Sequence, residues 1–199
     1  TDWELLRICP VPVLLIKSHG TYDAPRVLAA IDPAHSLDKP ARLDLSILAS
    51  ARSISHALDG TLEVVHAYPP APAKMPVDRM ARADAIERLQ ARQRQQAARH
   101  VGRVLKAAGT SRATQHLVGM HPVDAIPLIA RKMAADIVVM GAISRSGLRR
   151  VLFGDTAERL LDDLRCDLLI VKPPRFARRI SEHTNGPNLR SLLQPSQVV

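Results

Sequence analysis

The fold is decided by the stretch at residues 135–173, ADIVVMGAISRSGLRRVLFGDTAERLLDDLRCDLLIVKP. It begins with a nearly continuous apolar run at 135–141, which predicts a strand buried on both faces. A loop rich in glycine and arginine follows, then a periodic helix at 156–164 and a second apolar strand at 167–173. A strand, a crossover helix and another buried strand predict a parallel α/β sheet.

The same alternation extends toward the N-terminus. Further strands are predicted at 26–32, 60–68 and 113–119, and helices at 42–58, at about 78–108 and from a start near Asp124. Asp124 is the expected N-cap because Pro127 is tolerated best in a first turn. We therefore predict a doubly wound, five-stranded parallel sheet whose strands, counted along this unit, have the order 3-2-1-4-5.

Residues 1–17 stand outside this unit and read as a helix followed by a strand. A shift of 155 residues places Leu6 on Leu161, Leu14 on Leu169 and Lys17 on Lys172, which indicates a repeat of domain length. We expect 1–17 to be the last helix and strand of a preceding domain copy, 24–174 to be a complete domain and 175–199 to be a basic tail. The chain would then be the C-terminal half of a tandem protein.

Composition limits the other classes. Cys9 and Cys166 form no disulfide framework or ligand quartet, and they are expected to be buried thiols in a reducing compartment. No apolar run approaches the roughly 18 residues needed to cross a bilayer. These features predict a soluble, cytoplasmic protein without a membrane partner.

The net charge of +9 raises the question of nucleic acid. Residues 79–106 carry eight basic side chains, and the tail carries four arginines, but solvated faces often have such runs. The chain has only one Trp, two Tyr and two Phe, which argues against a platform on which bases stack. We therefore do not expect a nucleic-acid partner.

The stretch at 135–173 resembles the C-terminal signature of the universal stress protein family, as do AAID at 29–32 and the G-x-x-x-x-D-A-I step at 119–126. The repeated helix and strand resemble the two-domain branch of that family. The resemblance implies a Rossmann-like sandwich of the adenine nucleotide alpha hydrolase type and a role in stress response. It also implies homodimers or pseudo-dimers through the last strand, here Leu168, Leu169, Ile170 and Val171. The apolar segment at 11–17 is therefore expected to pair antiparallel with 168–172, in the same chain or in a neighbour.

Nucleotide-binding members of the family carry a glycine, two residues, a glycine, nine residues, and then a glycine with serine or threonine. Gly141 and Gly154 match the first and third glycines, whereas Ser144 replaces the second and Asp155 replaces the hydroxyl residue. The resemblance also places Asp32, at the end of the first strand, near the adenine or ribose. A turn-forming role for Asp32 before Pro33 is the alternative.

The residues of the loop that follows Gly141 leave open whether this loop binds phosphate. Asp155 and Glu158 form a capping box, in which the carboxylate would occupy the helix amides that bind phosphate and would repel a triphosphate. Arg145 and Thr156 offer a cation and a hydroxyl in compensation, although the loop arginines could equally be solvated or pair with nearby carboxylates. The candidate ligand-binding residues are Asp32, Gly141, Ser144, Arg145, Gly154, Asp155 and Thr156.

No catalytic or metal site is expected. His66, His116 and His121 lack the spacing of metal ligands, and no serine or cysteine stands in a nucleophile arrangement. The predicted function is binding of a ligand or partner in stress response, without catalysis and without a certain cofactor. The alternative is a protein that binds ATP and hydrolyses it slowly.

Overall fold

The computed structural model describes residues 6, 9–18, 20–35, 42–70, 79–141, 160 and 162–173. Predictions for Ser144, Arg145, Gly154, Asp155, Thr156 and the tail at 175–199 lie outside these residues. The elements, in chain order, are β1 (Val13–Leu15), β2 (Arg26–Ala30), η1 (Pro33–His35), α2 (Leu43–Ala57), β3 (Thr61–Ala67), α3 (Arg79–Ala107), β4 (Thr114–Val118), α4 (Pro122–Lys132), β5 (Ile137–Gly141) and β6 (Asp167–Val171).

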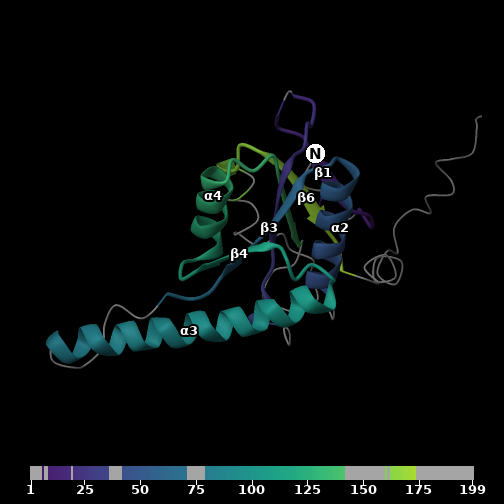
Figure 1. Cartoon of the computed structure of the whole chain (residues 1–199). Coiled ribbons are helices and arrows are strands. Elements are labelled where there is room, and N and C mark those ends of the chain that lie inside the picture. Colours follow the sequence, from purple (N-terminus) through teal and green to yellow (C-terminus); the bar gives the residue numbers. More distant parts are fainter. Residues whose placement is uncertain are drawn as a thin grey trace, which may run out of the picture.

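The strands form one mixed sheet in the order β1-β6-β5-β2-β3-β4 (Figure 1). Strands β2 to β6 pair with one another in parallel. The prediction of a five-stranded, purely parallel sheet is corrected by β1, which adds a sixth strand antiparallel to β6. That pairing confirms that the apolar segment at 11–17 joins the last strand, and it does so within the same chain.

Helices cover both faces of the sheet because its central strands are apolar on both sides. On one face, α2 and the C-terminal part of α3 bury a cluster that includes Val27, Ile47 and Val101. On the other face, α4 together with Leu160 and Leu164 buries a cluster that includes Leu28. Alternate residues of β2 thus belong to opposite cores, as the two-residue period of a strand requires.

Helix α4 begins earlier than predicted. Its N-cap is His121 rather than Asp124, and Pro122 occupies the first turn. Proline is preferred at that position because its missing N–H would have no partner there anyway. The helix consequently carries Pro127 inside its length, where the side chain is buried.

The segment around β1 is fastened to the domain at the start of β6. The buried carboxylate of Asp167 accepts hydrogen bonds from the backbone N–H groups of Lys17 and Ser18, at 2.7 and 2.8 Å, and from the Tyr22 hydroxyl. Burial alone would raise the pKa of Asp167, but these donors stabilise the carboxylate and lower it. Burial and the bond to Asp167 raise the pKa of Tyr22.

Two lysines make a reciprocal connection. Lys17 Nζ donates to the carbonyl oxygen of Leu164 at 2.8 Å, and the buried Lys172 Nζ donates to the carbonyl oxygen of Leu6. Burial lowers the pKa of Lys172 to about 8. Each lysine follows one of the two antiparallel strands and reaches the segment that precedes the other.

Cys9 and Cys166 are both free thiols and are half-buried rather than fully buried. Burial raises the pKa of Cys166. Within the described part of the chain, no helix is both long enough and apolar enough to cross a membrane.

Candidate ligand-binding site

The candidate site lies where the strand order reverses. From β2 the chain moves outward through β3 and β4, and it then returns to β5 on the other side of β2. The register pairs Ala29 with Val139, so equal steps along both strands place Gly141 level with Ile31 and one residue before Asp32. Asp32 and Gly141 therefore lie at the same, carboxyl edge of adjacent strands. Open α/β sheets bind their ligands at this switch point.

Gly141 is required by the packing of α2. A Cβ atom at this position would lie 2.7 Å from Leu43 Cδ2 and 3.3 Å from Ile47 Cδ1. Both contacts belong to buried side chains of α2, so an added side chain would force these side chains to shift within the core. The structure therefore gives this glycine a role in the fold, whether or not a ligand also approaches it.

Asp32 is connected to the same helix. Its backbone N–H donates to Asp44 Oδ1 at 3.1 Å, which ties the end of β2 to the first turn of α2. The Asp32 side chain keeps about a quarter of its surface exposed. A ligand at this edge can therefore reach the carboxylate.

His66 lies beneath Asp32 at the end of β3. Its side chain is 1% exposed, and Nδ1 lies 3.1 Å from the carbonyl oxygen of Ile31 and 3.9 Å from Asp32 Oδ1. Because a carbonyl oxygen only accepts, this contact assigns the proton to Nδ1. His66 thus supports the backbone that presents Asp32, and its burial keeps it away from a ligand.

The other histidines stand elsewhere. His116 Nε2 lies 2.5 Å from Glu63 Oε2 across β3 and β4, and His121 precedes α4. Among the described residues, no three His, Cys, Asp or Glu side chains come close enough to share a metal ion.

Tyr68 and Arg42 are two residues of this edge that the sequence analysis missed. Tyr68 follows β3, and its ring packs over Gly119, where an added Cβ would meet Tyr68 Cε2 at 3.1 Å. Its centroid lies 6.4 Å from that of His66. The position of Tyr68 in the sequence could have predicted this placement, because a residue that directly follows a parallel strand lies at the same edge of the sheet as Asp32.

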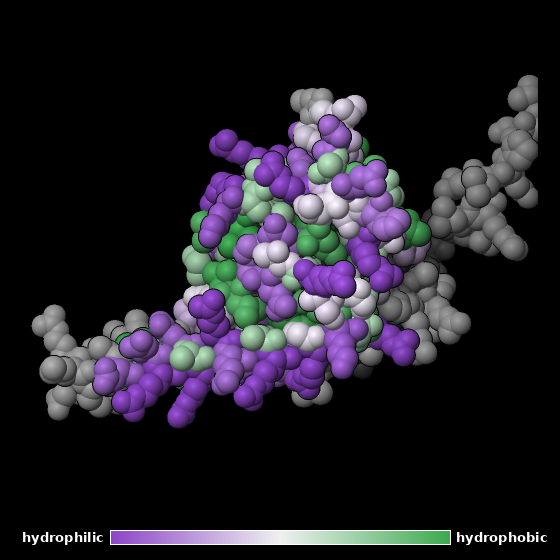
Figure 2. All heavy atoms as spheres, in the orientation of Figure 1, coloured by the Kyte–Doolittle hydropathy of each residue, from purple (hydrophilic) through white to green (hydrophobic). Residues whose placement is uncertain are grey.

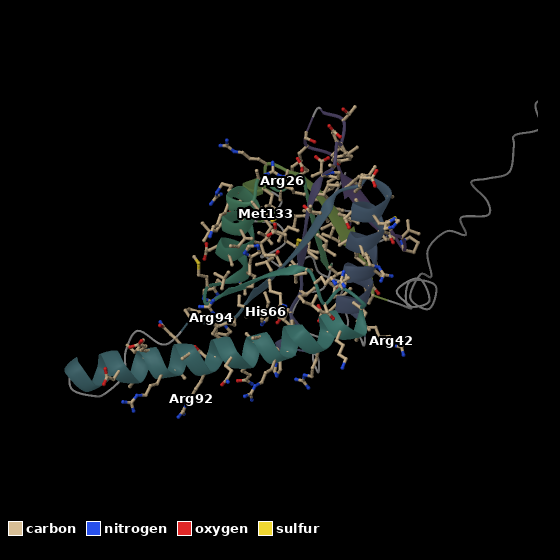
Figure 3. All side chains as sticks on the ribbon, viewed as in Figure 1. Arg26, Arg42, His66, Arg92, Arg94 and Met133 are labelled. Atoms are coloured by element: carbon tan, nitrogen blue, oxygen red, sulfur yellow. The ribbon has the colours of Figure 1, made fainter. Side chains whose placement is uncertain are left out.

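Arg42 precedes α2 in the left-handed conformation, with φ 80° and ψ 12°, and its side chain is exposed. Figure 3 shows Arg42 and His66 toward one end of the sheet and Arg26, which begins β2, toward the other. The edge therefore combines a reachable carboxylate, an aromatic ring and an exposed cation. Of the seven sequence-predicted residues, the structure brings Asp32 and Gly141 together, and the other five lie outside the described residues.

Comparisons with known proteins agree with this architecture. Residues 25–172 match the model of the universal stress protein family. Universal stress protein E of Escherichia coli K12 is 29% identical over 182 residues, which cover 88% of this chain and 55% of that protein. The homolog from Haemophilus influenzae is 28% identical over 180 residues, covering 87% and 56%. The chain thus spans little more than half the length of these curated relatives.

Two solved structures show the same fold. A functionally unknown protein from Pseudomonas aeruginosa PAO1 superimposes with a TM-score of 0.68 and 31% identity, covering 91% of this chain and 59% of that one. The protein UspA from Lactobacillus plantarum superimposes with a TM-score of 0.57 at 16% identity, covering 76% of this chain and 99% of that one.

Proposed function

Since the chain belongs to the universal stress protein family, we propose that residues 24–174 act in stress response as a binding module, which takes a small ligand at the switch point without transforming it. The observation that carries this proposal is the position of Asp32 beside Gly141 at the carboxyl edge of β2 and β5. Ligands of open α/β sheets lie in this place because the backbone there turns away on both sides and leaves a crevice.

The chemistry of the edge favours an adenine nucleotide as the ligand class. The Asp32 carboxylate can accept hydrogen bonds from ribose hydroxyls or an exocyclic amine. Arg42 is exposed at the start of α2 and can contact a phosphate oxygen. The proposal extends to the loop candidates Ser144, Arg145, Gly154, Asp155 and Thr156, of which Gly154 matches the family motif and Arg145 and Thr156 offer a cation and a hydroxyl to the phosphates.

Binding without catalysis is favoured by the burial of His66. A general base must come within hydrogen-bond reach of the proton that it removes. With 1% of its side chain exposed and Nδ1 engaged by Ile31, His66 does not reach a ligand at this edge. The second candidate function, slow ATP hydrolysis, is favoured by the match of Gly141 and Gly154 to the glycines of nucleotide-binding members.

Thermal unfolding with and without nucleotide tests the proposal. At a hundredfold excess over its dissociation constant, a ligand adds about 2.7 kcal/mol, which raises the melting temperature by about 5 °C or more in a protein of this size. We expect such a shift with Mg-ATP or AMP, a smaller one for Asp32→Asn, and an unchanged one for Asp84→Asn on the exposed surface of α3.

Phosphate release separates the two functions. Binding of ATP without release of phosphate supports the binding module. Release of phosphate that is abolished by Asp32→Asn supports slow ATP hydrolysis. A wild-type protein whose melting temperature does not respond to millimolar nucleotide contradicts both nucleotide functions.

We also propose that residues 1–17 end a preceding domain and that the chain is the C-terminal half of a tandem protein. Support comes from the relatives, of which it spans 55–56%, and from the antiparallel pairing of β1 with Leu168, Leu169 and Ile170. The proposed dimer-like contact through the last strand is then a pseudo-dimer within one protein, because β1 already fills that edge. Light scattering at micromolar concentration should return the mass of a monomer. A dimer that persists in variants with reversed surface charges away from β1 would contradict the pseudo-dimer.

A further inference from the structure

Helix α3 is much longer than the sheet requires. Its 29 residues span about 43 Å at about 1.5 Å per residue. The C-terminal part buries Ala97, Val101 and Leu105 against the domain, whereas the N-terminal part extends well beyond the sheet (Figure 1). A large part of the helix surface is therefore available to a partner.

The side of α3 that faces solvent carries a row of cations. We call it the basic face, and it consists of Arg88, Arg92, Arg99, Arg103 and Lys106 together with Gln95 and Gln96. These side chains are all exposed, and the helical period places them opposite Ala97, Val101 and Leu105. Figure 2 shows hydrophilic side chains along α3, and Figure 3 shows Arg92 pointing away from the sheet. A shallow groove of about 850 Å³ runs between Arg92 and Lys106.

Little negative charge offsets this row. The sequence holds no Asp or Glu between Arg88 and Val123. Among the described residues, Arg88 of the basic face forms an ion pair with Asp84. Its Nη2 lies 3.8 Å from Asp84 Oδ2, and both side chains are exposed. Such exposed pairs contribute little and are readily exchanged. Among the residues that the structure describes, the basic face therefore presents a net positive charge to solvent.

We propose that the basic face binds double-stranded DNA through its phosphates, without sequence preference. Arginine, lysine and glutamine side chains are the groups that contact phosphate oxygens. The cores of protein interfaces are depleted of charged residues and enriched in aromatic ones, whereas the basic face carries five cations and no aromatic ring. Its lack of aromatic rings also disfavours single strands, which bind by stacking. The expectation against nucleic acid rested on two arguments: solvated faces often carry such basic runs, and the chain has few aromatic rings on which bases could stack. The second argument concerns single strands alone.

The shape of α3 favours DNA over duplex RNA. A helix that extends from its domain fits the major groove of B-DNA, which is about 12 Å wide. The major groove of A-form RNA is too narrow and deep for side chains to enter. From Arg88 to Lys106 the basic face covers 19 residues and rises by about 27 Å, which is most of one turn of B-DNA at roughly 34 Å.

Fluorescence anisotropy with the full chain and a labelled 20-base-pair DNA duplex tests the proposal. Five phosphate contacts predict that log K falls with log salt with a slope of about −4.5. The triple variant Arg92→Gln, Arg99→Gln, Arg103→Gln should reduce that slope to about −2 and weaken binding at least tenfold at 0.1 M salt. Glutamine retains helix propensity, and circular dichroism confirms the fold.

Two matched triple variants remove the same net charge elsewhere. One replaces the exposed Arg131, Lys132 and Arg165 with glutamine, and the other replaces Arg175, Arg178 and Arg179 of the basic tail. Both should bind DNA within about threefold of the wild type. Equal weakening by all three variants, loss confined to the tail variant, or equal affinity for duplex RNA would each overturn the proposal.

Discussion

Leu14 and Leu169 lie directly opposite each other in the antiparallel ladder between β1 and β6. The 155-residue shift that aligns the two ends of the sequence maps the first of these residues onto the second. The same shift maps the residue before Leu14 onto the residue before Leu169, yet in the ladder each of these pairs with the residue after the other. The ladder is therefore symmetric about the Leu14–Leu169 pair. Two copies of one strand that meet across a two-fold axis would pair in this register.

The two faces of β1 should respond differently to truncation. Leu15 packs against the core cluster shared by α4 and β6, whereas Leu14 points outward and is 38% exposed. Leu15→Ala should lower the free energy of unfolding by about 1–2 kcal/mol, and Leu14→Ala should change it by less than about 0.5 kcal/mol. Urea denaturation of both variants provides the comparison. Equal losses would mean that the alternation of β1 is not as the structure has it.

Gly141→Ala and Gly102→Ala should have opposite effects on stability. At Gly141 the new methyl group would meet buried atoms of Leu43 and Ile47, and we expect a loss of about 1–3 kcal/mol. At Gly102, within α3, no atom lies within 4 Å of the added Cβ. Alanine there should gain up to about 1 kcal/mol from its higher helix propensity.

Thermal and urea unfolding of the two alanine variants measure the difference. If Gly141→Ala keeps wild-type stability, the close approach of α2 to the end of β5 is not a constraint. In that case the glycine would have to be explained by a ligand.

The sequence predicted the order and direction of the central strands because the apolar runs at 135–141 and 167–173 leave few ways to bury both faces. It also predicted that 11–17 would pair with β6, since an apolar edge needs a partner. It placed the start of α4 incorrectly because two prolines, Pro122 and Pro127, compete for the first turn, and only the geometry shows which one occupies it.

The candidate site was harder to predict. Asp32 and Gly141 follow from strand order, because residues at the ends of adjacent parallel strands meet. Tyr68 and Arg42 carry no motif, and they reach this edge through the tertiary packing of Gly119 and the start of α2. The structural reason for Gly141 was equally hidden, since it depends on the distance between α2 and β5.

Asp167 should make stability depend on acidic pH. Because its three donors lower the pKa of the folded carboxyl group, the unfolded chain takes up the proton first as the pH falls. Its contribution is therefore complete at neutral pH and is lost below about pH 4, as the pH passes through the lowered pKa. Asp167→Asn should cost about 2–3 kcal/mol at pH 7 and clearly less at pH 3.

Asp163→Asn is the matched control, because this carboxylate is exposed on the segment just before β6. Its effect should stay below about 0.5 kcal/mol at both pH values. A loss for Asp167→Asn that is the same at pH 3 and pH 7 would show that the carboxylate charge does not carry the interaction.

Lys172 should make stability depend on alkaline pH. Burial lowers its pKa from 10.5 to about 8 in the folded protein. Between these values the unfolded chain holds a proton that the folded protein has released, so stability rises with pH in this window. Below pH 8 both states are protonated, and the cost of burying the charge is constant. Full titration corresponds to about 3 kcal/mol.

Comparison with Lys172→Met isolates this effect. The raised pKa values of Tyr22 and Cys166 act in the opposite direction, but they are common to both proteins and cancel in the difference. The stability of the wild type relative to the variant should rise by about 2–3 kcal/mol between pH 7 and pH 10, as measured by urea denaturation. Lys106→Met, at an exposed position of α3, should show no such trend. A flat difference for Lys172→Met would mean that its ammonium group keeps its hydration in the folded protein and is not confined to the contact with Leu6.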